Sequence, residues 1–461
     1  MGQYDGKIVI IGAGSASFGM STLGDLMAMG AENLSGASIL LHDIDGENLD
    51  RVETVFKMAL DEANAEGEDI DFRLVSTIDL ELALQDASFI IMSIEHGNRM
   101  ETWAEDYYIP INHGSRQVYG ENGGVGGMFH TFRQVPPMLD IVDTMHDVCP
   151  DAWLFNYSNP LSRVTWSINR YCKREYNWNI KNVGLCHGIG AGLALVEGVF
   201  GGILKKCELV SAGLNHFYWF VKLQARQKLD IKSMGPFKQE TIQSGENLLP
   251  RLKERVIHWS REHEAPLIQE LATIYGHLTY PSQSHPGEYL FWADAYCPSV
   301  KYDFPGYARK SEALKKDLQA TINGKKNNYW WIKRSGERAI PIISAIVHDL
   351  NQDELAVNIT NGDCIQGLPR DCVVEVPATV NASGIHGKRI DPMPKGILAL
   401  LAHEVILQDL VVEAAITGDY NMAMQALCMD PTCPNPTIAR HILEEFLKHQ
   451  GHLLPQFLDG S

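Results

Sequence analysis

The sequence predicts an α/β protein whose amino-terminal part is a Rossmann-type, doubly wound parallel sheet. Short, continuous apolar runs recur early in the chain, and helical patterns separate them. Such runs are typical of strands buried on both faces, as in a parallel sheet that helices cover. The first run also leads directly into a glycine-rich turn and a helical pattern, which is how this fold usually starts. The predicted strands are 7–11, 37–42, 72–76, 87–94 and 152–155.

The length predicts more than one domain. From 461 residues we expect two or three, and we place one boundary between an amino-terminal sheet domain, 1–195, and an α/β carboxyl-terminal region, 196–461. In the second region, 354–359 and 372–377 alternate in polarity as antiparallel strands do, whereas 231–264 has a charged, helical pattern. No internal repeat or low-complexity linker separates the two regions, so they are expected to pack as one unit.

The charge and the cysteines exclude several classes of partner. A formal charge of −18 argues against nucleic acid and anionic membranes, because their phosphates would be repelled. No apolar run approaches the roughly 18 residues that a membrane-spanning helix needs. The nine cysteines are an odd number and form no C-x-x-C pair, which predicts a reducing, cytoplasmic location rather than a disulfide framework.

The first strand ends in a turn suited to a dinucleotide. Glycines at two positions let the backbone turn tightly and approach a pyrophosphate, which then lies on the N-terminus of the following helix. The third glycine of the usual fingerprint is a serine here, so the motif alone is weak evidence. The predicted cofactor-binding residues of this turn are Gly12, Gly14, Ser15, Ser17 and Phe18.

An acidic residue at the end of the second strand strengthens this interpretation. Asp43 could accept hydrogen bonds from the adenosine ribose and would repel a 2′-phosphate, which favours NAD over NADP. Asp45 competes for the role, but its position before 46–48 predicts a helix cap.

Polar residues follow the later strands, at the edge where ligands of such sheets bind. Residues 95–99 follow the fourth strand and include Arg99, and 156–160 follow the fifth. Asn159 could bind sugar or nicotinamide groups, although a plain turn at Asn159-Pro160 is the alternative. Between these strands, 119–127 holds five glycines in nine residues and predicts a flexible lid or a second backbone cradle.

Two further strand ends carry a thiol and an imidazole. Cys186 ends the apolar run 182–185, and His216 follows the run 209–212. Sulfur and nitrogen ligands suit Mn²⁺, Fe²⁺, Co²⁺ or Zn²⁺, and only two protein ligands would leave positions open for a substrate. The alternative is a buried apolar cysteine and a hydrogen-bonded core histidine.

Taken together, these motifs resemble glycoside hydrolase family 4, over nearly the whole chain. The resemblance implies NAD and Mn²⁺ (or Fe²⁺, Co²⁺ or Ni²⁺) as cofactors, with Cys186 and His216 as metal ligands. It also implies a fold related to lactate and malate dehydrogenases, a carboxyl-terminal region for substrate, metal and oligomerisation, and homodimers or homotetramers. The segments that carry it are 12–15, Asp43, 109–110, 113–117, 126–127, Arg133, 135–136, 156–160, 186–188, 213–216, 367–369 and 374–377.

The residues after the predicted metal cysteine resemble one subgroup of that family. Cys-His-Gly-x, here 186–189, accompanies unphosphorylated α-glycosides, whereas other triplets accompany 6-phosphoglycosides. We therefore expect an α-glucosidase that takes a small-molecule glycoside. An α-glucuronidase, α-galacturonidase or α-galactosidase of the same family is the alternative.

The family resemblance also implies a mechanism without the usual pair of carboxylates. The sugar is oxidised at C3 by bound NAD, deprotonated at C2, and loses its aglycone from C1; water then adds and C3 is reduced again. The predicted base is Tyr289, with packing in the core as its alternative interpretation. The predicted acid is Glu121, with His187 as the alternative. His285 is a third ligand or a substrate contact, and Asn159, Arg99 and Arg116 are predicted to hold substrate oxygens.

Two functions of other classes remain open from the sequence. A hydroxy-acid or polyol dehydrogenase would bind NAD but would want a His-Asp proton relay and would not need Cys186. A protein that senses NAD without catalysis would tolerate the loss of both Cys186 and His216.

Overall fold

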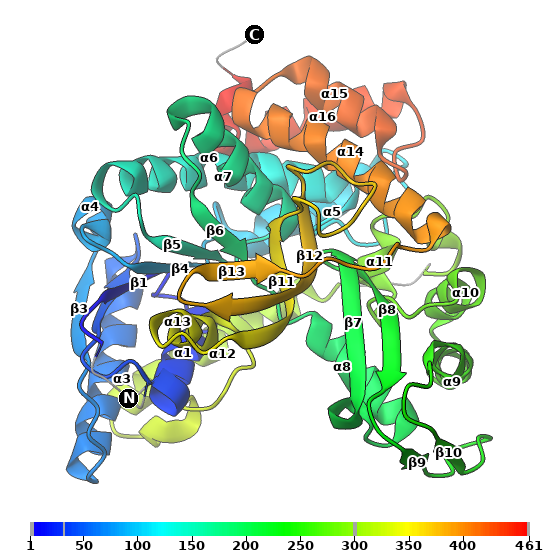
Figure 1. The fold of residues 1–461 in the computed structure, drawn as a ribbon. Coiled ribbons are helices and arrows are strands. Elements are labelled where there is room, and N and C mark those ends of the chain that lie inside the picture. Colours follow the sequence, from blue (N-terminus) through cyan, green and yellow to red (C-terminus); the bar gives the residue numbers. More distant parts are fainter. Residues whose placement is uncertain (1–3, 31–32, 298–301, 459–461) are drawn as a thin grey trace.

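The fold is built on one large mixed sheet, seen in a computed structural model that describes residues 4–30, 33–297 and 302–458. The sheet has 11 strands, in the order β3-β2-β1-β4-β5-β6-β11-β12-β7-β8, with β13 paired to β12 (Figure 1). A separate hairpin is formed by β9 and β10. The strands are β1 (Lys7–Ile11), β2 (Ser38–His42), β3 (Arg73–Thr77), β4 (Phe89–Met92), β5 (Trp153–Asn156), β6 (Lys181–Gly184), β7 (Cys207–Leu214), β8 (Phe217–Ala225), β9 (Leu229–Ile231), β10 (Glu240–Ile242), β11 (Gln352–Thr360), β12 (Val373–Asn381) and β13 (Gly384–Gly387).

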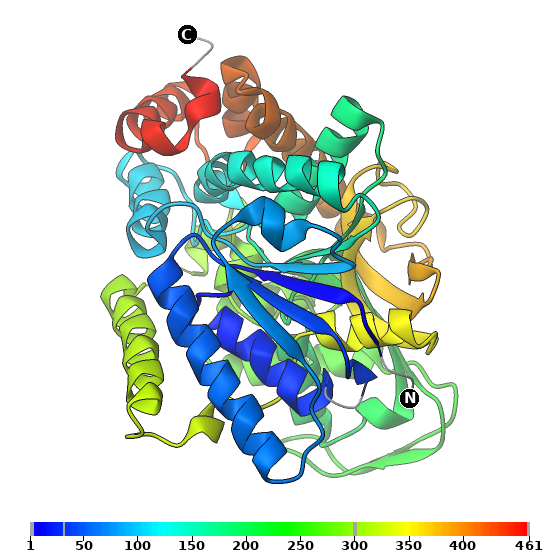
Figure 2. The ribbon, with the colours of Figure 1, turned by 90° about the vertical axis from the view of Figure 1, so that its left-hand side faces the viewer.

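Helices cover both faces of the amino-terminal half of this sheet (Figure 2). Helices α1 and α3 lie on one face, and α6 and α7 lie on the other (Figure 1). The helices are α1 (Phe18–Asp25), α3 (Gly46–Ala65), α4 (Leu80–Leu84), α5 (Arg99–Asn112), α6 (Gly124–Val148), α7 (Leu161–Tyr176), α8 (Ile189–Phe200), α9 (Leu249–Glu262), α10 (Pro266–Tyr275), α11 (Ser284–Gly287), α12 (Phe304–Ile322), α13 (Ala339–Val347), α14 (Lys395–Thr417), α15 (Tyr420–Met429) and α16 (Pro436–Gln450).

The doubly wound prediction is confirmed by the pairing of the first six strands. Each adjacent pair from β3 to β6 is parallel, in the Rossmann order. In β1, Ile8 and Ile10 enter one hydrophobic cluster, whereas Val9 and Ile11 enter another on the opposite face. Alternate residues thus face two buried layers, which explains why this strand is apolar throughout.

The antiparallel carboxyl-terminal strands extend the same sheet. Strand β11 pairs with β6 at Asn358 and Gly184, and β12 pairs with β7 at Glu375 and Gly213. The prediction that 354–359 and 372–377 are antiparallel strands is confirmed, and the structure pairs them with each other. Because β11 and β12 lie between β6 and β7, they fix the distance between the end of β6 and the β7–β8 turn. The domain boundary near 195 stays a prediction.

The helical prediction for 231–264 is wrong in its first half. Strands β9 and β10 form a hairpin there, and the helix begins only at Leu249. Leu229, Ile231 and Ile242 pack into the cluster beneath α8 and α9, so tertiary burial decides the local structure. Positive φ angles at Gly235 (54°) and Gly245 (83°) mark the turns that interrupt a helix.

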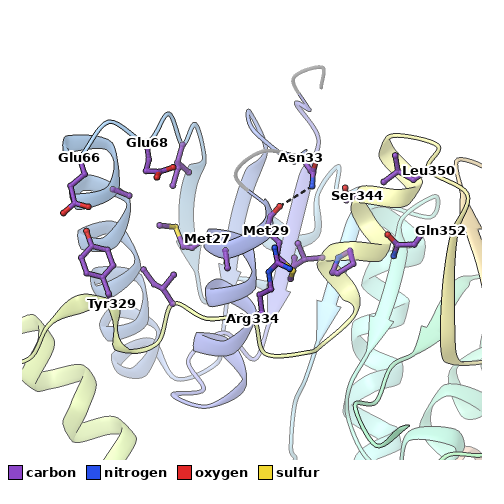
Figure 3. Close-up of a pocket in the computed structure, with 16 residues that line it drawn as sticks. Met27, Met29, Asn33, Glu66, Glu68, Tyr329, Arg334, Ser344, Leu350 and Gln352 are labelled. Carbon is purple, nitrogen blue, oxygen red and sulfur yellow. Dashed lines mark hydrogen bonds between the residues drawn. The ribbon is translucent and has the colours of Figure 1, made fainter. Parts of the chain in front are cut away.

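One cavity of about 570 Å³ lies between α3, α13 and the segment that precedes α13 (Figure 3). Its lining includes Met27, Glu66, Arg334 and Ser344, and none of the predicted site residues. Within the described residues, no helix is both long and apolar enough to cross a bilayer.

Candidate active site

The turn after β1 is shaped for close approach by a ligand. Gly12 has a φ of 83°, and a Cβ atom there would lie 2.0 Å from the Ser93 carbonyl oxygen at the end of β4. The Ser15 hydroxyl accepts a hydrogen bond from the backbone N–H of Phe18 (3.1 Å), in the first turn of α1. The turn therefore needs glycine for steric reasons, and its backbone fits the cradle that a pyrophosphate requires.

Asp43 is tied to this turn. One of its carboxylate oxygens accepts a hydrogen bond from the Gly14 N–H (2.8 Å), and the other accepts from the Asp45 N–H (2.9 Å). A carboxylate oxygen has a further lone pair, so both remain able to accept from a ribose hydroxyl. Asp45 caps α3 through the Asn48 N–H, as predicted. Ser17, at the other end of the turn, immediately precedes α1.

The sheet brings Cys186 and His216 together. The Cys186 Sγ lies 3.6 Å from the His216 Nε2, although the two residues are thirty positions apart. The Asn122 side-chain amide donates to the His216 Nδ1 (3.1 Å) and so orients the ring toward the sulfur. The Gly188 N–H donates to the same sulfur (3.3 Å). The predicted sulfur and nitrogen ligands therefore already lie side by side.

A buried carboxylate and a second imidazole lie next to this pair. Donor atoms of Glu121, His216 and His285 all lie within 4.8 Å of one another, which is a spacing that could hold one metal ion. The His285 ring stacks on Tyr280 at a centroid distance of 4.3 Å and on Tyr119 at 5.2 Å. These two stacks fix the imidazole in the cluster.

Burial sets the charge state of the pair. It raises the pKa of the Cys186 thiol to about 12, and it lowers the pKa of His216 well below its ordinary value, with the charges of His285 and His187 adding to the effect. A neutral imidazole is ready to bind a metal ion. A thiol ligates as thiolate, so binding of a cation here must release a proton.

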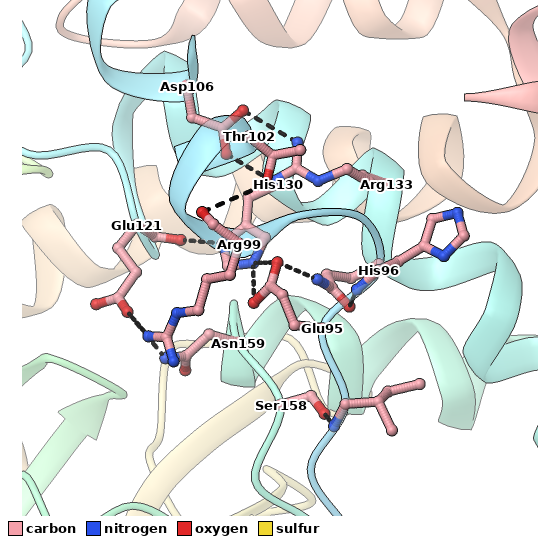
Figure 4. A network of polar contacts seen from close by, with 12 residues as sticks. Glu95, His96, Arg99, Thr102, Asp106, Glu121, His130, Arg133, Ser158 and Asn159 are labelled. Atoms are coloured by element: carbon pink, nitrogen blue, oxygen red, sulfur yellow. Dashed lines mark hydrogen bonds and ion pairs between the residues drawn. The ribbon is translucent and has the colours of Figure 1, made fainter. Parts of the chain in front are cut away.

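Glu121 is held from three sides (Figure 4). The Asn159 amide donates to its carboxylate (3.3 Å), and the Arg99 guanidinium forms an ion pair with it at 3.6 Å. Its backbone carbonyl accepts from the His130 Nδ1 (2.9 Å), and the His130 Nε2 donates to Glu95 (3.2 Å) at the end of β4. The three predicted residues Glu121, Asn159 and Arg99 thus meet at one point of the site.

The glycine-rich loop wraps around a carboxylate that sequence reasoning missed. The Oε1 of Glu288 accepts hydrogen bonds from the N–H groups of Gly120 (3.0 Å), Glu121 (2.6 Å) and Asn122 (3.2 Å), and its Oε2 accepts from Gly123 (3.1 Å). Burial and the charge of Glu121 raise the pKa of Glu288 to about 8, against the opposing effect of these donors. The glycine-rich loop thus forms a backbone cradle, but the group that its N–H groups bind is the side chain of Glu288.

Three predicted residues lie apart from the cluster. The Tyr289 hydroxyl donates to the Asn215 carbonyl oxygen (3.3 Å), and its ring stacks on Phe217 at 4.7 Å. His187 is exposed and pairs with Glu337, and Arg116 forms a two-pronged ion pair with Asp294 (2.8 and 2.9 Å). Their catalytic and binding roles stay predictions.

Tyr280, rather than the predicted Tyr289, borders the ligand pair. Its ring approaches His216 at a centroid distance of 5.4 Å as well as stacking on His285. Burial raises its pKa, and the charges of Cys186 and Glu121 add to the effect. No local pattern singled it out, because its approach depends on how the segment after α10 crosses the β7–β8 turn.

Comparison with known proteins agrees with this geometry. The model of "Family 4 glycosyl hydrolase" matches residues 7–197, and that of its C-terminal domain matches residues 211–433. An α-glucosidase of Erwinia rhapontici is 35% identical over 450 residues, covering 92% of this chain and 93% of the relative. An α-galactosidase of Bacillus subtilis (strain 168) is 27% identical, covering 98% of this chain and 99% of the relative. A crystal structure of a 6-phospho-α-glucosidase from gut microorganisms, in complex with NAD and Mn²⁺, has a TM-score of 0.81 at 20% identity, covering 99% of this chain and 100% of that one.

Proposed function

Because the chain belongs to family 4 of the glycosyl hydrolases, we propose that it hydrolyses an unphosphorylated α-glycoside, and first of all an α-glucoside. The approach of Cys186 and His216 to within 3.6 Å, beside the buried Glu121, carries this proposal. The relative that is 35% identical is an α-glucosidase, which supports the choice of sugar. A cytoplasmic location and a homodimer or homotetramer are parts of the same proposal.

The residues present fit the two cofactors that the proposal needs. Cys186 and His216 would hold Mn²⁺ or a similar ion, and the turn at Gly12 with Asp43 would hold NAD. Bound NAD would supply a reversible hydride acceptor at C3 of the sugar, and the metal ion a Lewis acid for neighbouring sugar oxygens. The solved 6-phospho-α-glucosidase with its bound NAD and Mn²⁺ is consistent with this assignment.

The side chains around the cluster would bind the substrate and transfer its protons. Asn159 would donate to a substrate hydroxyl, and Glu121 would transfer a proton at the glycosidic oxygen, held in place by Arg99. Tyr280 is better placed than Tyr289 to take the proton from C2, because its ring borders the ligand pair while the Tyr289 hydroxyl is engaged with Asn215. A phenol next to a bound cation would ionise more readily than burial alone allows.

A panel of p-nitrophenyl α-glycosides tests the proposal. With NAD⁺, Mn²⁺ and a reductant, the protein is expected to release p-nitrophenol from the α-glucoside. A chelator should abolish the activity and added Mn²⁺ should restore it, because two protein ligands hold the ion reversibly. Steady accumulation of NADH without release of p-nitrophenol would instead indicate a dehydrogenase.

Hydrolysis in D₂O tests the proposed chemistry separately. Proton removal at C2 and its later return predict one deuterium at C2 of the product sugar. Mass spectrometry and proton NMR of the product measure this. A product without deuterium at C2 would contradict the redox route and would favour direct displacement at C1.

A further inference from the structure

Glu337, beside the candidate site, has a buried carboxylate oxygen for which the described residues offer no hydrogen-bond donor. Its Oε1 accepts a hydrogen bond from the His187 Nδ1 (2.8 Å), so it borders the residue that follows Cys186. Its Oε2 has no hydrogen-bond donor among the residues that the structure describes, and the side chain is 17% exposed. A desolvated carboxylate oxygen is costly unless a donor satisfies it, so this atom calls for a donor from outside the chain.

The carboxylate lies between the predicted nicotinamide crevice and the ligand pair. Its Oε1 bonds the ring of His187, next to Cys186, and the backbone N–H of Arg338, the next residue along the chain, donates to the Tyr157 hydroxyl (3.2 Å). Tyr157 follows β5, and its ring packs on Phe18 at a centroid distance of 4.9 Å, at the start of α1. We therefore expect a sugar that contacts both the ligand pair and the nicotinamide to approach Glu337.

Two arginines near Glu337 and the donor cluster are already paired with carboxylates. Arg99 is paired with Glu121, and Arg338 forms two hydrogen bonds with Glu354 (2.7 and 2.8 Å). Glu337 adds a carboxylate beside Cys186, and its partner there is the His187 imidazole rather than an arginine. Both arginines therefore already have a carboxylate partner and are not free to bind a substrate phosphate or carboxylate.

We propose that Glu337 determines specificity by accepting a hydrogen bond from a hydroxyl of a neutral sugar, and that its charge excludes uronides and 6-phosphoglycosides. This inference rests on the proposed function, because the sugar is the one to be hydrolysed. The inference favours a neutral substrate, as for an α-glucosidase or α-galactosidase. It argues against the α-glucuronidase and α-galacturonidase alternatives.

The test compares the wild type with Glu337→Gln on neutral and anionic glycosides. Loss of a charged acceptor is expected to lower kcat/KM for the p-nitrophenyl α-glucoside about 10- to 100-fold. Activity on the α-glucuronide and the 6-phospho-α-glucoside should rise relative to the glucoside, because the repulsion is gone. Glu312→Gln is the matched control. Glu312 is exposed on α12, so this substitution removes the same charge away from the candidate site.

A binding measurement separates this inference from the proposed function. Titration of glucose, glucuronate and glucose 6-phosphate into the protein with NAD⁺ and Mn²⁺ should give binding of glucose alone in the wild type. The variant should bind glucose more weakly and the two anions more tightly. Equal preferences in wild type and variant would overturn the inference, and so would a variant whose only change is weaker NAD⁺ binding, since Glu337 would then contact the nicotinamide amide. Failure of the wild type to cleave any α-glycoside would overturn the proposed function, whatever the sugars bind.

Discussion

Replacing Cys186 with serine is expected to lower kcat for the α-glucoside by about 1000-fold or more. A metal ion that polarises substrate oxygens contributes several kcal/mol to the transition state, and each ~1.4 kcal/mol is a factor of ten in rate. Serine is a poor ligand for a borderline metal ion. Of the two predicted ligands, which lie 3.6 Å apart in the wild type, only His216 would remain. Calorimetric titration with Mn²⁺ should show the loss of affinity directly.

NAD binding should survive the same replacement. The turn at Gly12 and the carboxylate of Asp43 directly follow β1 and β2, and they share no hydrogen bond with Cys186. The control is Cys428→Ser, because Cys428 is an exposed cysteine away from the cluster and should leave rate and metal affinity unchanged. Full activity of Cys186→Ser without added metal would contradict the assignment of the ligand pair.

The parts of the site that the sequence predicts are those carried by strand ends. The apolar runs of β1 and β4, with the turn at Gly12, identify the edge of the sheet where a cofactor binds. Cys186 and His216 follow apolar runs in the same way, so their position at an edge could be predicted. Their actual approach could not, because it depends on β11 and β12, which lie far away in the sequence.

Residues outside the strands were harder to assign. Glu288 and Tyr289 are neighbours in the sequence, and the family resemblance favoured the tyrosine as the base. The structure turns Glu288 toward the glycine-rich loop and Tyr289 toward Phe217. The direction of each side chain follows from the short helix α11 and from the stacking of His285, which local periodicity does not encode.

Removal of the Glu288 carboxylate is expected to affect both stability and catalysis. Glu288→Ala leaves the N–H groups of residues 120–123 without their acceptor in a buried site. Each unsatisfied buried donor costs about 1–3 kcal/mol, so the free energy of unfolding should fall by several kcal/mol. Thermal and urea unfolding measure this loss.

The catalytic effect follows because the loop carries two residues of the site. Glu121 belongs to the donor cluster, and the Asn122 amide orients His216. A displacement of about 1 Å in such groups costs on the order of 100-fold in rate, so kcat should fall even at temperatures where the variant is folded. The affinity for Mn²⁺ should fall as well, since the orientation of a metal-binding histidine contributes about 10- to 100-fold to affinity.

Glu288→Gln distinguishes the carboxylate from the mere presence of an acceptor. Its amide oxygen can still accept from the three N–H groups that now bond Oε1, whereas its NH₂ group would face the N–H of Gly123. The glutamine NH₂ group and the Gly123 N–H are both donors, so they cannot bond each other. The stability, the rate and the Mn²⁺ affinity of Glu288→Gln should therefore lie between those of the wild type and those of Glu288→Ala. Glu68→Ala, at an exposed position, should change none of the three. If Glu288→Ala unfolds at the wild-type temperature and binds Mn²⁺ as tightly, the loop holds its shape without Glu288. The order of Glu121 and Asn122 must then come from their other contacts, with His130, Asn159, Arg99 and Leu161.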